Sequence, residues 1–169
     1  MTAYQIACSE LEAEPRTWLV TGVAGFIGSN LLESLLRLGQ RVVGVDDFST
    51  GSPKNLEDVR KLVGADPWKR FDFREGTLID VGICRDACNY ADYVLHEGGF
   101  VSVPLSNQDP VGCHHANVNG TLNLLVAARD NRVKRFVHAS SRVVYGGSTK
   151  VPLTTTTRSS RPLGSSPML

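Results

Sequence analysis

The 169-residue sequence contains no apolar run that approaches the roughly 20 residues needed to cross a bilayer as a helix. At its N-terminus it lacks both the basic segment and the apolar segment that together form a secretory signal. Net charge is also nearly absent, because 18 lysines and arginines stand against 17 aspartates and glutamates. These absences argue against a membrane protein, a secreted protein and a broad nucleic-acid-binding surface, and they favour a cytoplasmic location.

Cysteine is scarce and irregularly spaced, with four residues in the whole chain. Cys84 and Cys88 stand at i and i+4 in an expected helix and could share one face, but no second cysteine pair or suitably spaced histidine accompanies them. His96, His114 and His115 likewise have no partners at the spacing of metal ligands. We therefore expect free thiols in a reducing compartment and no metal site.

The sequence does contain a regular alternation of two hydrophobic patterns. Short apolar runs rich in β-branched residues predict strands at 17–22, 41–47, 69–76, 92–98 and 133–141. Segments with helical apolar spacing lie between them, at 26–39, 55–63, 80–91 and 109–131. This alternation predicts an α/β fold, a doubly wound parallel sheet of five strands covered by helices on both faces.

The two ends of the chain differ in composition from the part between them. Residues 1–15 form a polar leader that Pro15 closes, and we expect the folded domain to span 16–146. Residues 147–169 are rich in serine, threonine and proline and contain no acidic residue. Such a segment buries too little apolar surface to fold alone, so we expect a disordered tail.

Three glycines lie between the first predicted strand and the first predicted helix, in GVAGFIG at 22–28. In a strand–turn–helix context Gly22 permits the sharp turn, Gly25 lets the backbone approach a pyrophosphate, and Gly28 lets helix and strand pack closely. Asp46 ends the second strand, where a carboxylate accepts hydrogen bonds from a ribose and repels a 2′-phosphate. Glycine-rich turns also occur without a ligand, but strand, helix and acid together favour a dinucleotide site for NAD rather than NADP.

Six motifs spread over most of the chain carry a family resemblance. They are the glycine motif at 22–28, DDFSTG at 46–51, YVLHEGG at 93–99, SVP at 102–104, NVNGTLNLL at 117–125 and ASSRVVYG at 139–146. Through them the chain resembles the extended short-chain dehydrogenase/reductase family, in its NAD-dependent nucleotide-sugar epimerase branch, whose NAD-binding domain has the Rossmann fold. The leader, the segment WLVTGVAGFIGSNLLE around the glycines and the SVP motif are most similar to bacterial UDP-N-acetylglucosamine 4-epimerases of polysaccharide biosynthesis.

The resemblance implies a tightly held NAD that takes a hydride from C4 of a UDP-sugar and returns it to the other face of the ring. In the family a Tyr-x-x-x-Lys pair supplies the base, and Ser141 stands where the family has its catalytic Ser or Thr. By the same resemblance, Ser102 and Val103 bind the substrate. The implied cofactor-binding residues are Gly22, Gly25, Phe26, Ile27, Gly28, Asp46, Asp47, Ser49, Thr50, Gly51, Thr77, Leu78, Gly98 and Asn117.

The chain departs from the family at positions that carry the chemistry. Tyr145 and Lys150 stand at i and i+5 where no helix is predicted, and Met168 occupies the place of the catalytic tyrosine. Thr77 replaces an aspartate that bonds the adenine amino group in the family. Glu97 replaces a neutral residue and would bring an anion near the pyrophosphate. We therefore expect a chain that is inactive alone and binds NAD less tightly than its relatives do.

Members of the family are roughly twice as long as this chain, so it resembles a truncated N-terminal part without the C-terminal lobe that binds the UDP-sugar. The helix at 109–131 matches a common dimer interface of the family, which suggests a homodimer. Three interpretations stay open. The chain is the NAD-binding part of a UDP-N-acetylhexosamine (UDP-GlcNAc/UDP-GalNAc) 4-epimerase, a regulatory NAD-binding module or subunit completed by a partner chain, or a degenerate or incomplete reading frame.

Overall fold

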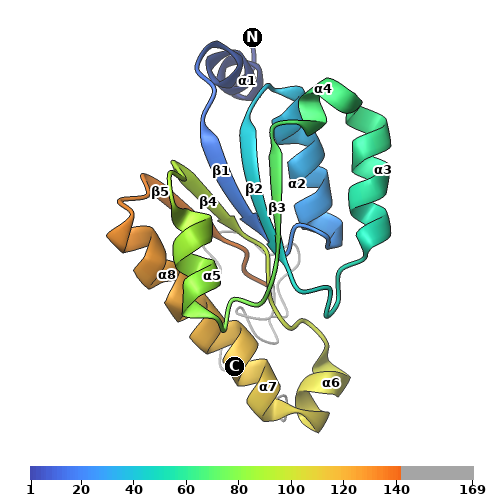
Figure 1. Cartoon of the computed structure of the whole chain (residues 1–169), viewed down its shortest axis with the longest axis vertical. Helices are drawn as coiled ribbons and strands as arrows, with labels where there is room; N and C mark the ends of the chain where they lie inside the picture. The colour runs from blue at the N-terminus through green and yellow to red at the C-terminus, as the bar shows by residue number, and fades with distance from the viewer. Residues whose placement is uncertain (142–169) are drawn as a thin grey trace, which may run out of the picture.

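The structure of the protein, a computed structural model, describes residues 1–141 and contains one five-stranded sheet (Figure 1). Its strands are β1 (Thr17–Thr21), β2 (Arg41–Asp46), β3 (Phe71–Glu75), β4 (Tyr93–His96) and β5 (Arg135–His138). All neighbouring strands are parallel, in the order β3-β2-β1-β4-β5. The predicted doubly wound α/β fold is confirmed. Because the strand order reverses between β1 and β4, a crevice opens at their carboxyl ends.

Helices cover both faces of the sheet (Figure 1). On one face lie α2 (Phe26–Arg37), α3 (Pro53–Val63) and the short α4 (Ala65–Trp68), and on the other lie α5 (Val81–Cys88) and α8 (Gly120–Asp130). Beyond the carboxyl ends of the strands lie α6 (Val103–Gln108), α7 (Pro110–His114) and the π-helical segment η1 (His115–Asn119). The predicted single helix at 109–131 is therefore three consecutive segments.

Each face of the sheet has its own core, because successive side chains of a strand point to opposite faces. Leu19 packs with Val94 and Leu124 in the cluster under α5 and α8. The next residue, Val20, packs with Leu36 in the cluster under α2 and α3. Fully burying one such aliphatic side chain contributes about 1.5–3 kcal/mol, so the two cores fix the sheet and hold its carboxyl edge in place.

The polar leader contains a helix that the sequence patterns did not predict, α1 (Ala3–Ala13). None of its residues is buried, so no apolar period marks it in the sequence. A capping box between Thr2 and Gln5 begins the helix. The buried amide of Gln40 connects α1 to the sheet, since its Nε2 donates to the carbonyl of Leu11 (2.7 Å) and its Oε1 accepts from Trp18 Nε1 (3.1 Å). A long-range polar contact therefore holds the helix.

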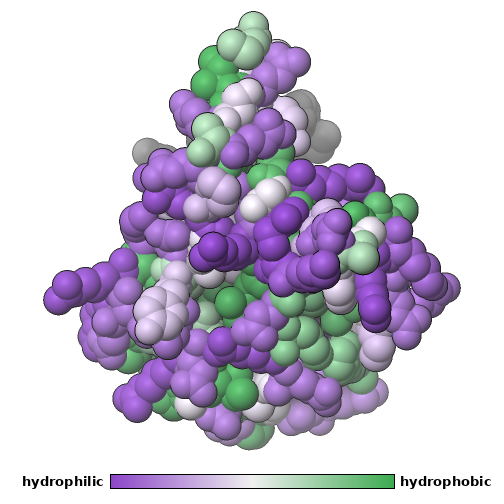
Figure 2. Space-filling model, turned by 45° about the horizontal axis from the view of Figure 1, so that its top comes forward, coloured by the Kyte–Doolittle hydropathy of each residue, from purple (hydrophilic) through white to green (hydrophobic). Residues whose placement is uncertain are grey.

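Polar and apolar residues are interspersed on the face of the molecule seen in Figure 2. On η1 and α8, Val118, Leu122 and Leu125 are 41%, 58% and 44% exposed at spacings typical of one helix face. This is the helix for which a homodimer is predicted, and that association stays a prediction. Over residues 1–141, no helix is long and apolar enough to span a membrane.

Candidate dinucleotide-binding site

A cavity of about 370 Å³ opens at the carboxyl ends of β1, β2 and β4, next to the first turn of α2. This is the crevice at the reversal of strand order, where open α/β sheets bind ligands. Most of the residues predicted to hold the cofactor line it. They are Gly22, Gly25, Phe26, Ile27, Gly28, Asp46, Asp47, Ser49, Thr50, Thr77, Leu78 and Gly98.

The glycine loop approaches its neighbours too closely for any side chain. Gly22 has a φ of +65°, and a Cβ there would lie 2.8 Å from the backbone nitrogen of Gly98. A Cβ on Gly28 would overlap the carbonyl of Gly22 and lie 2.8 Å from the Cα of Val23. Gly25 is the N-cap residue of α2 and provides no side-chain cap. As in any α-helix, the first N–H groups of α2 have no intrahelical acceptor, and because no side chain caps them they form a favourable place for an anion.

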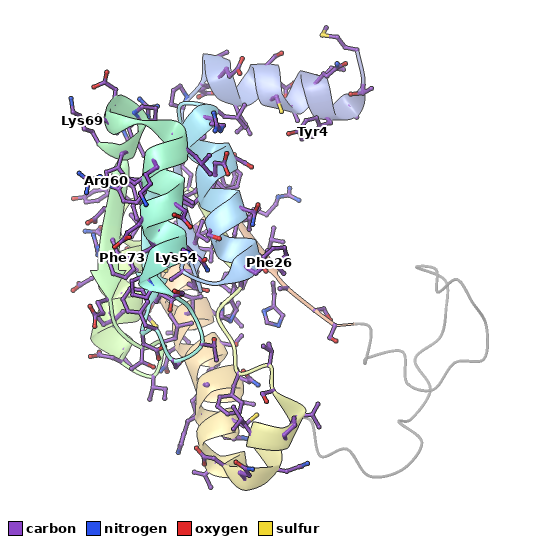
Figure 3. The ribbon with its side chains drawn as sticks, turned by 90° about the vertical axis from the view of Figure 1, so that its right-hand side faces the viewer. Tyr4, Phe26, Lys54, Arg60, Lys69 and Phe73 are labelled. Atoms are coloured by element: carbon purple, nitrogen blue, oxygen red, sulfur yellow. The ribbon has the colours of Figure 1, made fainter. Side chains whose placement is uncertain are left out.

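The first turn of α2 also carries an exposed aromatic ring. Phe26, labelled in Figure 3, lines the cavity and is 83% exposed, and Ile27 beside it is 54% exposed. The sequence patterns assigned both to cofactor binding. Their exposed apolar surface at the mouth of the cavity is available to cover a ligand that lies against the helix N-terminus.

Asp46 joins the second strand to the glycine loop through its carboxylate. Oδ2 accepts from the backbone N–H of Ala24 (2.9 Å), and Oδ1 accepts from that of Phe48 (2.8 Å). Each carboxylate oxygen keeps a further lone pair, so the group can still accept a hydroxyl hydrogen bond. A Cβ on Gly51 would lie 2.8 Å from Asp46 Oδ1, which places this predicted cofactor residue behind Asp46 rather than in the cavity lining.

A buried histidine fixes the wall that follows β4. His96 Nδ1 lies 2.7 Å from Thr21 Oγ1, its Nε2 lies 2.9 Å from Thr121 Oγ1, and Thr21 Oγ1 also accepts from the N–H of Gly98 (3.1 Å). Burial lowers the pKa of His96 to about 4, with a smaller contribution from His138, so the ring is neutral at pH 7. The arrangement fits a Thr21 hydroxyl that donates to Nδ1 and an Nε2–H that donates to Thr121.

The sequence patterns treated His96 as an ordinary residue at a strand end. The sequence did not predict that His96 connects β1, β4 and α8 through hydrogen bonds. Thr21 and His96 are 75 residues apart and become neighbours only through the register of β1 and β4. The available signal was that each of these adjacent strands ends in a polar side chain.

Asn117 holds the same wall from the other side. Its Oδ1 accepts from the N–H of Phe100 (2.6 Å), and its Nδ2 donates to the carbonyl of Phe100 (3.0 Å). The residue lies in the π-helical segment η1, and short π-helical segments within α-helices occur frequently at functional sites. Asn117 is not among the residues that line the cavity, so its predicted contact with the cofactor stays a prediction, and the structure gives it a supporting position behind the wall.

Charge in the cavity is negative on the protein side. Asp46, Asp47 and Glu97 line it, and no lysine or arginine within residues 1–141 does. Burial raises the pKa of the Glu97 carboxyl, and the imidazole of His138 opposes that rise. At the other end Thr77 lines the cavity with a hydroxyl that accepts from the N–H of Ile79 (3.4 Å). Phosphates bound here would be held by backbone N–H groups and by hydroxyl groups such as those of Ser49 and Thr50, without a cationic side chain from residues 1–141.

The predicted catalytic and substrate residues lie outside the cavity lining. Ser141 is exposed and follows β5, and Ser102 caps the N-terminus of α6, in which Val103 is the first residue. Tyr145 and Lys150 lie outside the described residues. Across the part of the chain that the structure describes, no three His, Cys, Asp or Glu side chains come together as a metal site requires.

The parallel sheet, the glycine loop and the carboxylate at the end of β2 define a Rossmann-type dinucleotide-binding domain. Residues 18–167 match the NAD dependent epimerase/dehydratase family. The chain belongs to that family.

Individual relatives are nucleotide-sugar enzymes. The UDP-glucose 4-epimerase of Erwinia amylovora is 38% identical over 141 residues, which cover 82% of this chain and 41% of the relative. The structure of a UDP-glucose 4-epimerase from Stenotrophomonas maltophila, with bound NAD and a formylated UDP-arabinopyranose, aligns with a TM-score of 0.78 at 28% identity, over 86% of this chain and 43% of that one.

A UDP-N-acetylglucosamine 4-epimerase from Methanobrevibacter ruminantium, in complex with UDP-N-acetylmuramic acid, aligns with a TM-score of 0.75 at 27% identity, over 88% of this chain and 44% of that one. The chain thus spans about two fifths of the length of the curated relatives that it matches.

Proposed function

We propose that the cavity binds NAD. The observation that carries this proposal is the uncapped first turn of α2, which faces a ligand space bordered by Asp46 and closed by glycines that exclude side chains. The backbone N–H groups of Phe26 and Ile27 would meet the pyrophosphate. Asp46 would accept hydrogen bonds from the hydroxyl groups of the adenosine ribose and would repel a 2′-phosphate. The aligned Stenotrophomonas maltophila enzyme, which holds NAD, supports NAD as the ligand.

The two ends of the cofactor would then lie on the two halves of the sheet. Thr77 and Leu78 border the cavity beyond β3, where the adenine would lie. The wall from Glu97 to Val101 follows β4 and would border the nicotinamide half. Ser102, Val103, Ser141 and Asn117 keep the roles that the family resemblance implies, as parts of this proposal.

For the full-length protein to which these residues would correspond, we propose 4-epimerisation of a nucleotide sugar, with a UDP-N-acetylhexosamine as the substrate. We propose a cytoplasmic location for it. The UDP-glucose and UDP-N-acetylglucosamine 4-epimerases among the relatives support the reaction type. The sequence 1–169 contains no Tyr-x-x-x-Lys. Since that pair supplies the proton transfer in the resembled family, we propose that these residues alone bind NAD without epimerising a sugar.

A second candidate function is an NAD-binding subunit that a partner completes. The exposed apolar side chains of Val118, Leu122 and Leu125 favour it, because a second copy or another chain could cover them. The two candidates share the NAD site and differ in where the acid–base residues come from. A partner that restores epimerase activity when mixed with the chain would select this candidate.

Calorimetric titration of the purified chain with NAD tests the shared proposal, together with a check for NAD carried through purification. We expect micromolar binding by the wild type. Asp46→Asn should weaken NAD binding about tenfold, because it removes the acceptor of the ribose hydroxyls. The matched control is Asp72→Asn, a surface carboxylate outside the cavity, which should bind NAD as the wild type does. A folded wild type that binds no NAD contradicts the proposal.

A further inference from the structure

Glu97 lies on the opposite half of the cavity from Asp46. It directly follows β4, whereas Asp46 ends β2, and the strand order reverses between β1 and β4. A dinucleotide bound across such a reversal places one nucleotide on each half of the sheet. Because a carboxylate at the position of Asp46 holds the adenosine ribose, the half that carries Glu97 is the nicotinamide half.

The three carboxylates that line the cavity in the described part of the chain differ in their hydrogen bonding. Those of Asp46 and Asp47 accept backbone N–H groups, at 2.8–2.9 Å. Within residues 1–141 the carboxylate of Glu97 has no hydrogen bond and no ion pair, although its backbone N–H donates to the carbonyl of Thr21 (3.3 Å). The imidazole of His138 on β5 acts on this carboxyl and opposes the rise in its pKa that burial causes. The side chain is partly buried, so solvent screens its charge only in part.

The two redox forms of the cofactor differ in charge at one place. The nicotinamide ring of NAD⁺ carries a positive charge, and the addition of a hydride makes the ring of NADH neutral. The pyrophosphate has the same charge in both forms. A carboxylate on the nicotinamide half therefore repels the phosphates of both forms equally, but attracts the ring of NAD⁺ alone. In a ratio of the two affinities the repulsion cancels and the attraction remains.

We propose that ionised Glu97 is a specificity-determining residue that makes the cavity select NAD⁺ over NADH. This inference rests on the proposed function, since it requires NAD in the cavity. One consequence concerns the bound cofactor. A site that prefers the oxidised form makes the cofactor harder to reduce by the same factor, because binding and reduction form one thermodynamic cycle.

The test is a set of dissociation constants for three ligands: NAD⁺, NADH and ADP-ribose, which lacks the nicotinamide. The variants are Glu97→Gln and Glu97→Ala, and the matched control is Glu75→Gln. Glu75 is an exposed carboxylate at the end of β3, on the same edge of the sheet but outside the cavity lining. Titration calorimetry gives the constants, and NADH fluorescence confirms the reduced form. Circular dichroism confirms that each variant is folded.

At about pH 8 we expect the ratio of the NADH dissociation constant to the NAD⁺ dissociation constant to fall about tenfold in both Glu97 variants. Such a change corresponds to about 1.4 kcal/mol. Both variants should bind ADP-ribose more tightly than the wild type does, because the repulsion of the phosphates is gone. The Glu75 control should keep the wild-type ratio. The difference between wild type and Glu97→Gln should shrink as the pH falls and the Glu97 carboxyl, whose pKa burial raises, becomes protonated.

The possible failures are distinguishable. If the wild type binds NAD⁺ and the ratio is the same in the wild type and in a folded Glu97 variant, the inference is overturned and the proposed function stands. If the folded wild type binds none of the three ligands, the proposed function is overturned, and the inference with it.

Discussion

Replacing Thr21 by valine tests whether the buried hydroxyl at the end of β1 holds the cavity wall. Valine keeps the β-branched shape of this fully buried residue and removes only its hydrogen bonds. Two groups lose a partner: the N–H of Gly98, now 3.1 Å from Oγ1, and Nδ1 of His96, now 2.7 Å from it. The substitution therefore separates the polar role of the side chain from its packing.

The expected loss of stability follows from the cost of an unsatisfied buried polar group, about 1–3 kcal/mol each. Two such groups give a decrease of about 2–6 kcal/mol in the free energy of unfolding. That is a large share of the roughly 5–15 kcal/mol typical of a domain. Thr21→Ser keeps the hydroxyl and loses one methyl group, so it should cost only about 1 kcal/mol. The serine variant is therefore the matched control.

Urea unfolding followed by circular dichroism measures both free energies, and amide hydrogen exchange at Gly98 reports the wall itself. We expect exchange at Gly98 to accelerate in Thr21→Val and to stay slow in Thr21→Ser. We also expect NAD to bind about tenfold more weakly to the valine variant, because the wall is no longer fixed. If valine and serine variants are equally stable and exchange Gly98 equally fast, the hydroxyl does not hold the wall and the reasoning is refuted.

Two further predictions concern Thr77 and His96. Thr77→Asp should strengthen NAD binding about tenfold in a calorimetric titration. Residue 77 lies at the end of the cavity where the adenine would lie, and a carboxylate there would accept a hydrogen bond from the adenine amino group. Unchanged or weaker binding would contradict this. The second is a loss of stability as the pH falls. Burial holds the folded pKa of His96 at about 4, below the unfolded value near 6.5, so the unfolded state binds more protons between these values. Stability is thus fully present above about pH 6.5 and decreases toward pH 4 by about 3 kcal/mol, and urea unfolding of the wild type should show a steeper decrease than that of His96→Gln.

Local patterns predicted the parts of the fold and site that local residues determine. The alternation of apolar periods gave the five strands and the doubly wound sheet, and the spacing of Gly22, Gly25 and Gly28 located the turn before α2. The sequence placed Asp46 at the end of the second strand, where the structure has it lining the cavity, and its contact with a ribose stays a prediction. In each case the signal lies within about 20 residues of sequence.

Contacts between distant segments explain what the sequence did not predict. Helix α1 has no buried residue and is connected to the sheet through Gln40, 29 residues from its acceptor on Leu11. His96 forms a hydrogen bond with Thr21, which is 75 residues away in the sequence. Asn117 accepts a hydrogen bond from the backbone of Phe100, and it lies in the π-helical segment η1, which no hydrophobic period in the sequence reveals. These are single pairs of polar atoms, and they become visible only when the register of the strands is known.

The charges of the cavity decide which ligand it can hold. Because its lining in residues 1–141 includes Asp46, Asp47 and Glu97 and no cationic side chain, Coulomb attraction cannot supply the affinity for a pyrophosphate. We expect the affinity to come from the N–H groups of α2, from the hydroxyl groups of Ser49 and Thr50, and from the fit that the glycines permit. A third phosphate on the adenosine ribose would face the carboxylates of Asp46 and Asp47 with no cation to offset them. We therefore expect the absence of cations from the lining within residues 1–141 to disfavour NADP more than NAD, because the 2′-phosphate adds a charge that these carboxylates repel.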